Sequence, residues 1–207
     1  DFYSDTKTKP SHAMLEYALG RTFGDEQKDE DPTTLELCER IAHLLGKESA
    51  VFLPSGTMCN EIAITVQTSP GDEIICDRSS HIINFEGGAP AAMSGVMIHP
   101  LDGKYGQFTE EDVRQALRPE SRYMPISRML CAEQTVNLGG GAVWQLEKLD
   151  SVAQVAKNSG LSTHLDGARL LNACVKTGIS AAHYSREYDS CWIDFTKGLG
   201  APIGAVL

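Results

Sequence analysis

Short apolar runs alternate with longer segments of helical periodicity along most of the chain, and this alternation constrains the fold more than any other feature. The apolar runs predict strands over Ser49–Leu53, Glu73–Cys76, Gly95–His99, Met129–Ala132, Leu161–Asp166 and Cys191–Thr196. Strands that alternate with helices are typical of an α/β domain with a largely parallel sheet covered on both faces. We therefore expect one α/β domain.

The segments between these strands predict helices, and the clearest of them begins at Pro32. Asp31 is a favourable N-cap, proline suits the first helical position, and Gly46 is favourable just after the last residue, Leu45. Apolar residues at helical spacing predict further helices over residues 57–68, 109–117, 146–160 and 167–177.

Composition narrows the classes of partner. The 207 residues include 28 acidic and 18 basic side chains, for a formal net charge of −10. Nucleic acid is disfavoured because proteins that bind it generally are basic, and no apolar run approaches the about 20 residues of a membrane-spanning helix. The six cysteines lack the CxxC spacing of zinc or redox pairs, so we expect reduced thiols and no metal site. We therefore expect an intracellular protein, located in the cytoplasm or in an organelle.

Ligands of such sheets bind beyond the carboxyl ends of the strands, so the residues that follow each strand are candidates. Gly56 and Thr57 follow the first strand and open a helix, whose free N–H groups and partial positive charge suit a phosphate. No lysine follows the glycine as in a Walker loop, and the segment is not G-x-G-x-x-G. Taken alone, this segment is more often only a capped turn.

Charged residues follow two other strands. Asp166 ends the strand over 161–166, and Lys197 leads into a turn rich in glycine and proline. Taken separately, Asp166 is explained as a helix cap and Lys197 as a solvated surface charge. Together with Gly56 and Thr57 they indicate pyridoxal 5′-phosphate (PLP), which needs an amine for its aldehyde, a carboxylate for its ring nitrogen and an anion site for its phosphate. His81 follows another strand and could lie over the ring, or it could simply begin a helix.

At these residues the chain resembles the threonine aldolase family, within the β-eliminating-lyase-like group of fold-type I PLP-dependent enzymes. The matching stretches follow the family's order and span nearly the whole chain. They are Ser4-Asp5-Thr6, Gly24-Asp25-Glu26, Glu30-Asp31-Pro32-Thr33, Gly46-Lys47-Glu48, Pro54-Ser55-Gly56-Thr57-Met58, Gly71-Asp72-Glu73, His164-Leu165-Asp166-Gly167-Ala168-Arg169 and Lys197-Gly198-Leu199-Gly200-Ala201-Pro202-Ile203-Gly204.

The resemblance implies three catalytic residues that also bind the cofactor. Lys197 matches the Schiff-base lysine, Asp166 the carboxylate on the pyridine nitrogen, and His81 the ring-stacking histidine. The implied reaction is retro-aldol cleavage of a β-hydroxy-α-amino acid to glycine and an aldehyde, in which a base takes the β-hydroxyl proton.

The resemblance also implies binding residues. Arg169 matches an arginine near the cofactor O3′ and the substrate carboxylate, and Ser4 matches a second contact of that carboxylate. Gly56 and Thr57 match the phosphate site, and Thr196 is grouped with the cofactor-binding residues.

The implied fold is the large domain of a fold-type I PLP-dependent transferase, with a mixed, mostly parallel sheet covered by helices. Residues 1–24 are expected to form an N-terminal arm and first helix, and residues 25–207 the PLP-binding domain. The apolar residues 203–207 are expected to lie in a buried strand, with further strands and a C-terminal small domain following them. The resemblance implies a homo-oligomer, a dimer or tetramer, with active sites shared between subunits.

Two departures from the family pattern leave the reaction open. Val136 stands where relatives usually carry a histidine, and neither Tyr123 nor Met124 is the histidine that relatives often carry nearby. A PLP-dependent amino-acid racemase or β-eliminating lyase is therefore an alternative, since a racemase needs no base for a β-hydroxyl. A non-catalytic structural relative is a second alternative, against which the retention of Lys197 argues.

Overall fold

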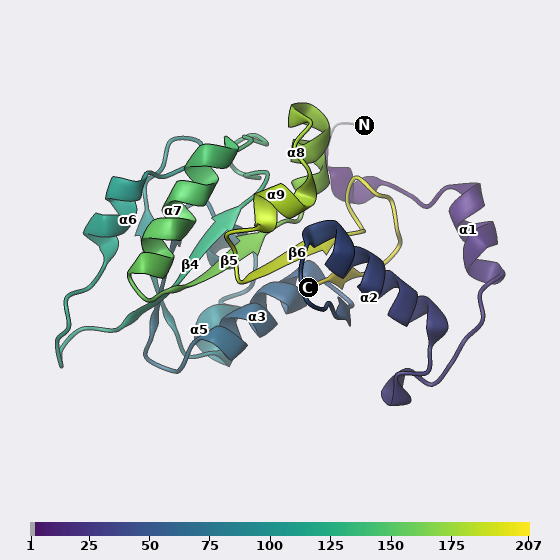
Figure 1. The fold of residues 1–207 in the computed structure, drawn as a ribbon, viewed down its shortest axis with the longest axis horizontal. Coiled ribbons are helices and arrows are strands. Elements are labelled where there is room, and N and C mark those ends of the chain that lie inside the picture. Colours follow the sequence, from purple (N-terminus) through teal and green to yellow (C-terminus); the bar gives the residue numbers. More distant parts are fainter. Residues whose placement is uncertain (1–2) are drawn as a thin grey trace.

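The computed structural model describes residues 3–207, in which a mixed seven-stranded sheet lies between helices (Figure 1). The strand order is β1-β7-β6-β5-β4-β2-β3. Neighbours from β6 to β3 pair in parallel, whereas β7 is antiparallel to both β6 and β1. The strands are β1 Phe52–Leu53, β2 Glu73–Asp77, β3 Met97–Leu101, β4 Ser127–Glu133, β5 Ser162–Asp166, β6 Ser190–Asp194 and β7 Ala205–Val206. The expected mixed, mostly parallel sheet is confirmed.

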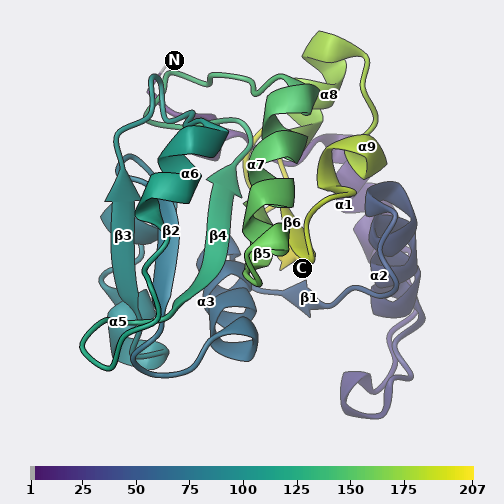
Figure 2. The same cartoon turned by 60° about the vertical axis from the view of Figure 1, so that its left-hand side comes forward.

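Helices cover both faces of the sheet. α3 and α5 lie on one face, while α6, α7, α8 and α9 lie on the other, with α2 packed against α9 (Figures 1 and 2). The α-helices are α1 His12–Leu19, α2 Pro32–Leu45, α3 Gly56–Gln67, α4 His81–Asn84, α5 Ala89–Met93, α6 Glu110–Ala116, α7 Leu146–Asn158, α8 Leu170–Thr177 and α9 Ala181–Ser185. Two 3-10 helices, η1 Asp5–Lys7 and η2 Glu26–Lys28, lie in the N-terminal region.

The predicted ends of α2 are confirmed by its caps. The Asp31 side chain accepts a hydrogen bond from the Thr34 N–H at 2.8 Å. Gly46 ends the helix with a φ of +63°, a left-handed conformation that glycine adopts without steric cost. Local side chains determine both ends, which is why the sequence predicts them.

Three predicted elements need correction. The expected buried strand over 49–53 is a two-residue edge strand, and Val51 is 46% exposed. Strand β3 begins at Met97 because Gly95 takes a left-handed turn, with a φ of +66°. Helix α8 begins at Leu170 rather than Gly167, because the Asp166 carboxylate first closes a turn onto the Ala168 N–H at 3.1 Å. The expected buried strand at 203–207 is present as β7, whose two residues are 0% exposed.

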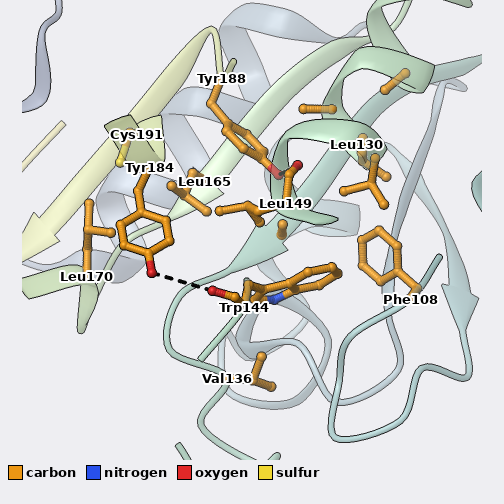
Figure 3. Close-up of a cluster of buried hydrophobic side chains, with 14 of the residues drawn as sticks. Phe108, Leu130, Val136, Trp144, Leu149, Leu165, Leu170, Tyr184, Tyr188 and Cys191 are labelled. Carbon is orange, nitrogen blue, oxygen red and sulfur yellow. Dashed lines mark hydrogen bonds between the residues drawn. The ribbon is translucent and has the colours of Figure 1, made fainter. Parts of the chain in front are cut away.

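The largest hydrophobic core lies between the sheet and the helices of the α7 face (Figure 3). Phe108 and Trp144 meet edge to face there, with ring centroids 5.1 Å apart. The Tyr188 hydroxyl donates to the Leu149 carbonyl at 3.1 Å, so this buried phenol is paired. Val136, which is 1% exposed, belongs to the same core.

Within residues 3–207, no helix has the length and apolar character needed to cross a membrane, and the six cysteines there are free. Helix α1 extends away from the sheet, and none of its residues is buried (Figure 1).

Candidate active site

Acidic residues end four parallel strands, at the edge of the sheet formed by the carboxyl ends of these strands. They are Asp77 on β2, Glu133 on β4, Asp166 on β5 and Asp194 on β6. Glu133 is directly opposite Asp166 in the β4–β5 register, so two carboxylates begin side by side. The basic side chains predicted for the site come from segments that follow these strands, which makes this edge the candidate active site.

Asp166 is buried and held on both carboxylate oxygens. Oδ1 accepts the Ala168 N–H at 3.1 Å, and Oδ2 accepts the Asn60 amide at 3.1 Å. Burial raises the pKa of Asp166, while the Asn60 hydrogen bond and the charges of Lys197 and His81 act in the opposite direction. The predicted carboxylate therefore interacts electrostatically with both other predicted catalytic residues.

Lys197 lies beside the end of the neighbouring strand, β6. Its Nζ donates to Asp194 Oδ2 at 2.7 Å and lies 5.4 Å from the centroid of a Trp192 ring. The other oxygen of Asp194 accepts both the N–H and the hydroxyl of Thr196, each at 2.6 Å. Asp194 thus holds the amine and the turn that carries it, and Thr196 is directed towards Asp194.

His81 begins α4 between two glutamates. Its N–H donates to Glu133 Oε2 at 3.0 Å, and its Nδ1 lies 2.6 Å from Glu86 Oε1. The Glu86 hydrogen bond raises the pKa of His81 and outweighs the opposing effect of burial. Burial, with Asp166 as a nearby charge, raises the pKa of Glu133 to about 7.

Arg169 is held by the N-terminal arm. Its Nε and Nη2 donate to the two carboxylate oxygens of Asp5 at 2.6 and 2.8 Å, a bidentate pair. This hydrogen bonding lowers the pKa of Asp5. Ser4, the predicted substrate contact, precedes Asp5 and caps η1 by accepting the Thr6 N–H at 3.2 Å. The ion pair thereby brings the segment that contains Ser4 to the edge of the site.

The predicted phosphate site is the start of α3. Gly56 packs against Trp192 so closely that a Cβ on Gly56 would lie 2.2 Å from the ring atom Cη2. The first N–H groups of a helix lack intrahelical acceptors, so Gly56 and Thr57 could offer theirs to an anion. The Thr57 hydroxyl itself hydrogen-bonds Glu86 and helps to lower the pKa of that carboxyl, against the effect of burial.

Sequence reasoning missed several residues of the site. Trp192 and Asp194 are two positions apart on β6, so both lie on the same face of the strand just before Lys197. This spacing is a signal that could have indicated them. Asn60 lies one helical turn after Thr57, another usable signal. Glu86 lies five positions after His81, just beyond α4, and no pattern in the sequence indicates that its carboxylate contacts the imidazole.

The two departures from the family pattern lie at opposite ends of β4, and Val136 follows Glu133 at the carboxyl end. Val136 is buried in the core beside Gly106, where a Cβ on the glycine would lie 2.4 Å from Val136 Cγ1. Tyr123 is 81% exposed in the loop that enters β4, at the opposite end of that strand from Glu133. Tyr123 is therefore remote from the candidate site, whereas Val136 lies close to Glu133 in sequence but has a buried apolar side chain.

Comparison with known proteins settles the family. The family model described as "Beta-eliminating lyase" matches residues 1–207. The chain belongs to the β-eliminating lyase family. Its relatives include the low-specificity L-threonine aldolase 1 of Arabidopsis thaliana, 36% identical over 100% of this chain and 59% of that protein. An uncharacterised protein of Caenorhabditis elegans is 38% identical over 100% of this chain and 50% of its own length.

The threonine aldolase of Leishmania major has the same fold as this β-eliminating lyase family member. The two structures superpose with a TM-score of 0.87 at 24% identity, covering 99% of this chain and 60% of the other. The expected fold, the large domain of a fold-type I enzyme, is confirmed. The chain spans about half to three-fifths of the length of these family members.

Proposed function

We propose that the protein is a PLP-dependent carbon–carbon lyase that cleaves a threonine-like β-hydroxy-α-amino acid to glycine and an aldehyde. The observation that carries this proposal is the placement of Lys197 and Asp166 beside neighbouring strand ends, with His81 close enough to the same carboxylate to influence its pKa. Relatives whose names state L-threonine aldolase activity match the whole chain.

The residues present fit PLP. The Lys197 side chain is only 12% exposed and carries an amine that could bond to the cofactor aldehyde. Asp166 could accept a hydrogen bond from the ring nitrogen, and the N–H groups of Gly56 and Thr57 at the start of α3 could donate to the phosphate. When bound, PLP supplies an electron-accepting ring for the carbanion left by carbon–carbon cleavage.

The protein's own residues would bind the substrate and move its protons. Arg169 would bind the α-carboxylate together with Ser4, which precedes the Arg169 partner Asp5 in the arm. His81 is held at Nδ1 by Glu86, which leaves Nε2 as the nitrogen able to exchange a proton. We propose that His81 takes the β-hydroxyl proton as the Cα–Cβ bond breaks. The aldehyde then leaves, and a proton returns to Cα to give glycine.

The racemase alternative depended on the absence of a histidine at Val136. The buried, apolar Val136 side chain cannot take the β-hydroxyl proton, so the lyase needs another base, and His81 is the residue that we assign to this step. The non-catalytic alternative leaves the joint placement of Lys197, Asp166, His81 and Arg169 unexplained. We therefore retain the lyase as the single proposed function.

We also propose a homo-oligomer, a dimer or tetramer, in which the first 24 residues form an arm on the domain made by residues 25–207. Four apolar side chains of the arm are 49–87% exposed: Leu15, Tyr17, Leu19 and Phe23. Such exposure is typical of an interface. Light scattering on full-length protein should give a multiple of the subunit mass, and a monomer would contradict the proposal.

We propose a cytoplasmic location, with an organelle as the alternative, because the six cysteines are free among residues 3–207. Fractionation of cells that express tagged protein tests this. Recovery outside the cell would contradict it.

Product analysis tests the proposed reaction. Full-length protein with PLP would be incubated separately with L-threonine, L-allo-threonine, L-phenylserine and each enantiomer of alanine. We expect glycine and the matching aldehyde in equal amounts from at least one hydroxy amino acid, and no change in alanine. Interconversion of the alanine enantiomers, or formation of a keto acid and ammonia, would overturn the lyase in favour of the alternatives.

A further inference from the structure

Asn60 on α3 is 0% exposed and makes four side-chain hydrogen bonds. Its Oδ1 accepts the Trp192 Nε1–H at 2.7 Å and lies 3.0 Å from His164 Nε2. Its Nδ2 donates to Glu86 Oε1 at 3.0 Å and to Asp166 Oδ2 at 3.1 Å. An amide side chain has two donors and two acceptor sites, so Asn60 uses its full capacity.

The neighbours of Asn60 determine which way its amide faces. The Trp192 indole can only donate, so the atom facing it must be oxygen. His164 then donates from Nε2, and its Nδ1 accepts from the Ser190 hydroxyl at 2.7 Å. Burial lowers the pKa of His164 to about 4, so its ring is neutral. With Oδ1 fixed in this way, both amide protons of Asn60 face carboxylates.

The two carboxylates have different places in the proposed site. Asp166 is the proposed partner of the cofactor ring nitrogen, and Glu86 is the partner of His81. Other charges near Asp166 are Lys197, His81 and the acidic Glu133. Asn60 is a neutral donor between the two acids, and it links them without adding charge.

We propose that Asn60 is a positioning residue that holds the Asp166 and Glu86 carboxylates in place and favours their ionised forms. This inference rests on the proposed function, because it assigns Asp166 to the ring nitrogen. Through Trp192, Asn60 also connects these acids to the indole beneath the Lys197 amine. One neutral side chain thus orders the groups around the amine, the carboxylate and the imidazole.

Removal of the amide should change the protonation of the cofactor. Without its donor, the Asp166 anion is less stable, and a proton shared with the ring nitrogen moves towards the carboxylate. A hydrogen bond to a charged group is stronger than one between neutral groups, so the pKa of the ring nitrogen should fall by about one pH unit or more in Asn60→Ala. Asn60→Ser keeps one donor and should show a smaller fall.

The experiment uses full-length protein loaded with PLP that carries ¹⁵N in its ring. The ring-nitrogen chemical shift would be titrated for wild type, Asn60→Ala, Asn60→Ser and the exposed control Asn158→Ala. We expect the pKa order wild type, Ser variant, Ala variant, with the control equal to wild type. Thermal unfolding of the same four proteins, prepared without PLP, measures any loss of stability separately.

The outcomes separate this inference from the proposed function. A lower unfolding temperature with an unchanged ring titration in both Asn60 variants would show a purely structural role and overturn the inference. If Asn60→Ala fails to fold, an unchanged titration in Asn60→Ser overturns it alone. Wild type that binds PLP and shows the expected order, but cleaves no hydroxy amino acid, would overturn only the proposed reaction. Wild type that binds no PLP would overturn both.

Discussion

Arg169 and Asp5 form a bidentate ion pair, at 2.6 and 2.8 Å, between residues 164 positions apart in the chain. The pair ties the N-terminal arm to the segment that follows β5. A second contact supports the same docking, since the Thr8 hydroxyl donates to the Lys197 carbonyl at 2.5 Å. The arm therefore touches both segments that carry the proposed cofactor and substrate residues.

Asp5→Ala should weaken substrate binding more than turnover. The Arg169 guanidinium would lose the partner that fixes its plane, and loss of charged hydrogen bonds predicts a rise in KM of about tenfold or more, with a smaller change in kcat. Steady-state kinetics on full-length protein would measure both constants. Asp25→Ala, an exposed cap of η2, is the control and should leave KM unchanged. An unchanged KM in Asp5→Ala would contradict the proposed role of the pair.

Asp166→Asn should preserve the fold and lower turnover on the order of a hundredfold or more, as expected for a group that acts electrostatically in the transition state. The amide keeps the size of the carboxylate but cannot carry the negative charge that holds a proton on the ring nitrogen. Single-turnover rates would show the loss. Turnover within a few-fold of wild type would remove Asp166 from the mechanism.

Gly56→Ala should destabilise the protein, because the new methyl group would lie 2.2 Å from Trp192 Cη2. Overpacking of this kind costs about 2 kcal/mol in the free energy of unfolding, and the displaced indole should also weaken PLP binding. Urea unfolding and a PLP titration would measure the two effects. Gly20→Ala is the control, since its Cβ would find its nearest neighbours at 3.7 Å. Equal stability of the two variants would contradict the packing argument.

Glu133 should give the protein a specific pH dependence. Burial raises its pKa from 4.5 to about 7 in the folded state, so its contribution to stability is full below pH 4.5 and is lost as the pH rises through about 7. Glu133→Gln removes this titration. The free energy of unfolding of wild type, relative to that variant, should therefore decrease across this range.

Urea unfolding of both proteins at several pH values provides the test. Glu147→Gln, on the exposed surface of α7, is the control and should follow wild type at every pH. The comparison with Glu133→Gln also removes the contribution of Glu61, whose pKa burial likewise raises to about 7. A difference that does not change with pH would show that Glu133 has an ordinary pKa.

The sequence predicts elements well where local contacts determine them. The ends of α2 follow from Asp31 and Gly46, and the start of α6 follows from the Thr109 cap. The exposure of β1 could not be predicted, because it depends on the position of Phe52 and Leu53 at the edge of the sheet. An apolar run of this kind looks the same in a central strand and in an edge strand.

Local sequence patterns likewise predict only some residues of the candidate site. Lys197, Asp166 and His81 are recognisable because each lies at the end of a predicted strand or in the segment that follows it. Asn60 is separated from Asp166 by 106 positions and from Trp192 by 132, so only the fold brings these hydrogen-bond partners together. The sequence therefore predicts the groups that would contact the cofactor, and the structure identifies the groups that position them.

Covalent attachment of PLP at Lys197 is the most direct test of the central claim. Full-length protein loaded with PLP would be reduced with borohydride, digested and analysed by mass spectrometry, alongside Lys197→Ala and the exposed control Lys176→Ala. We expect the reduced cofactor on the peptide that contains Lys197 in wild type and in the control, and no labelled peptide in a folded Lys197→Ala protein. Labelling of another lysine, or undiminished labelling in Lys197→Ala, would contradict the account.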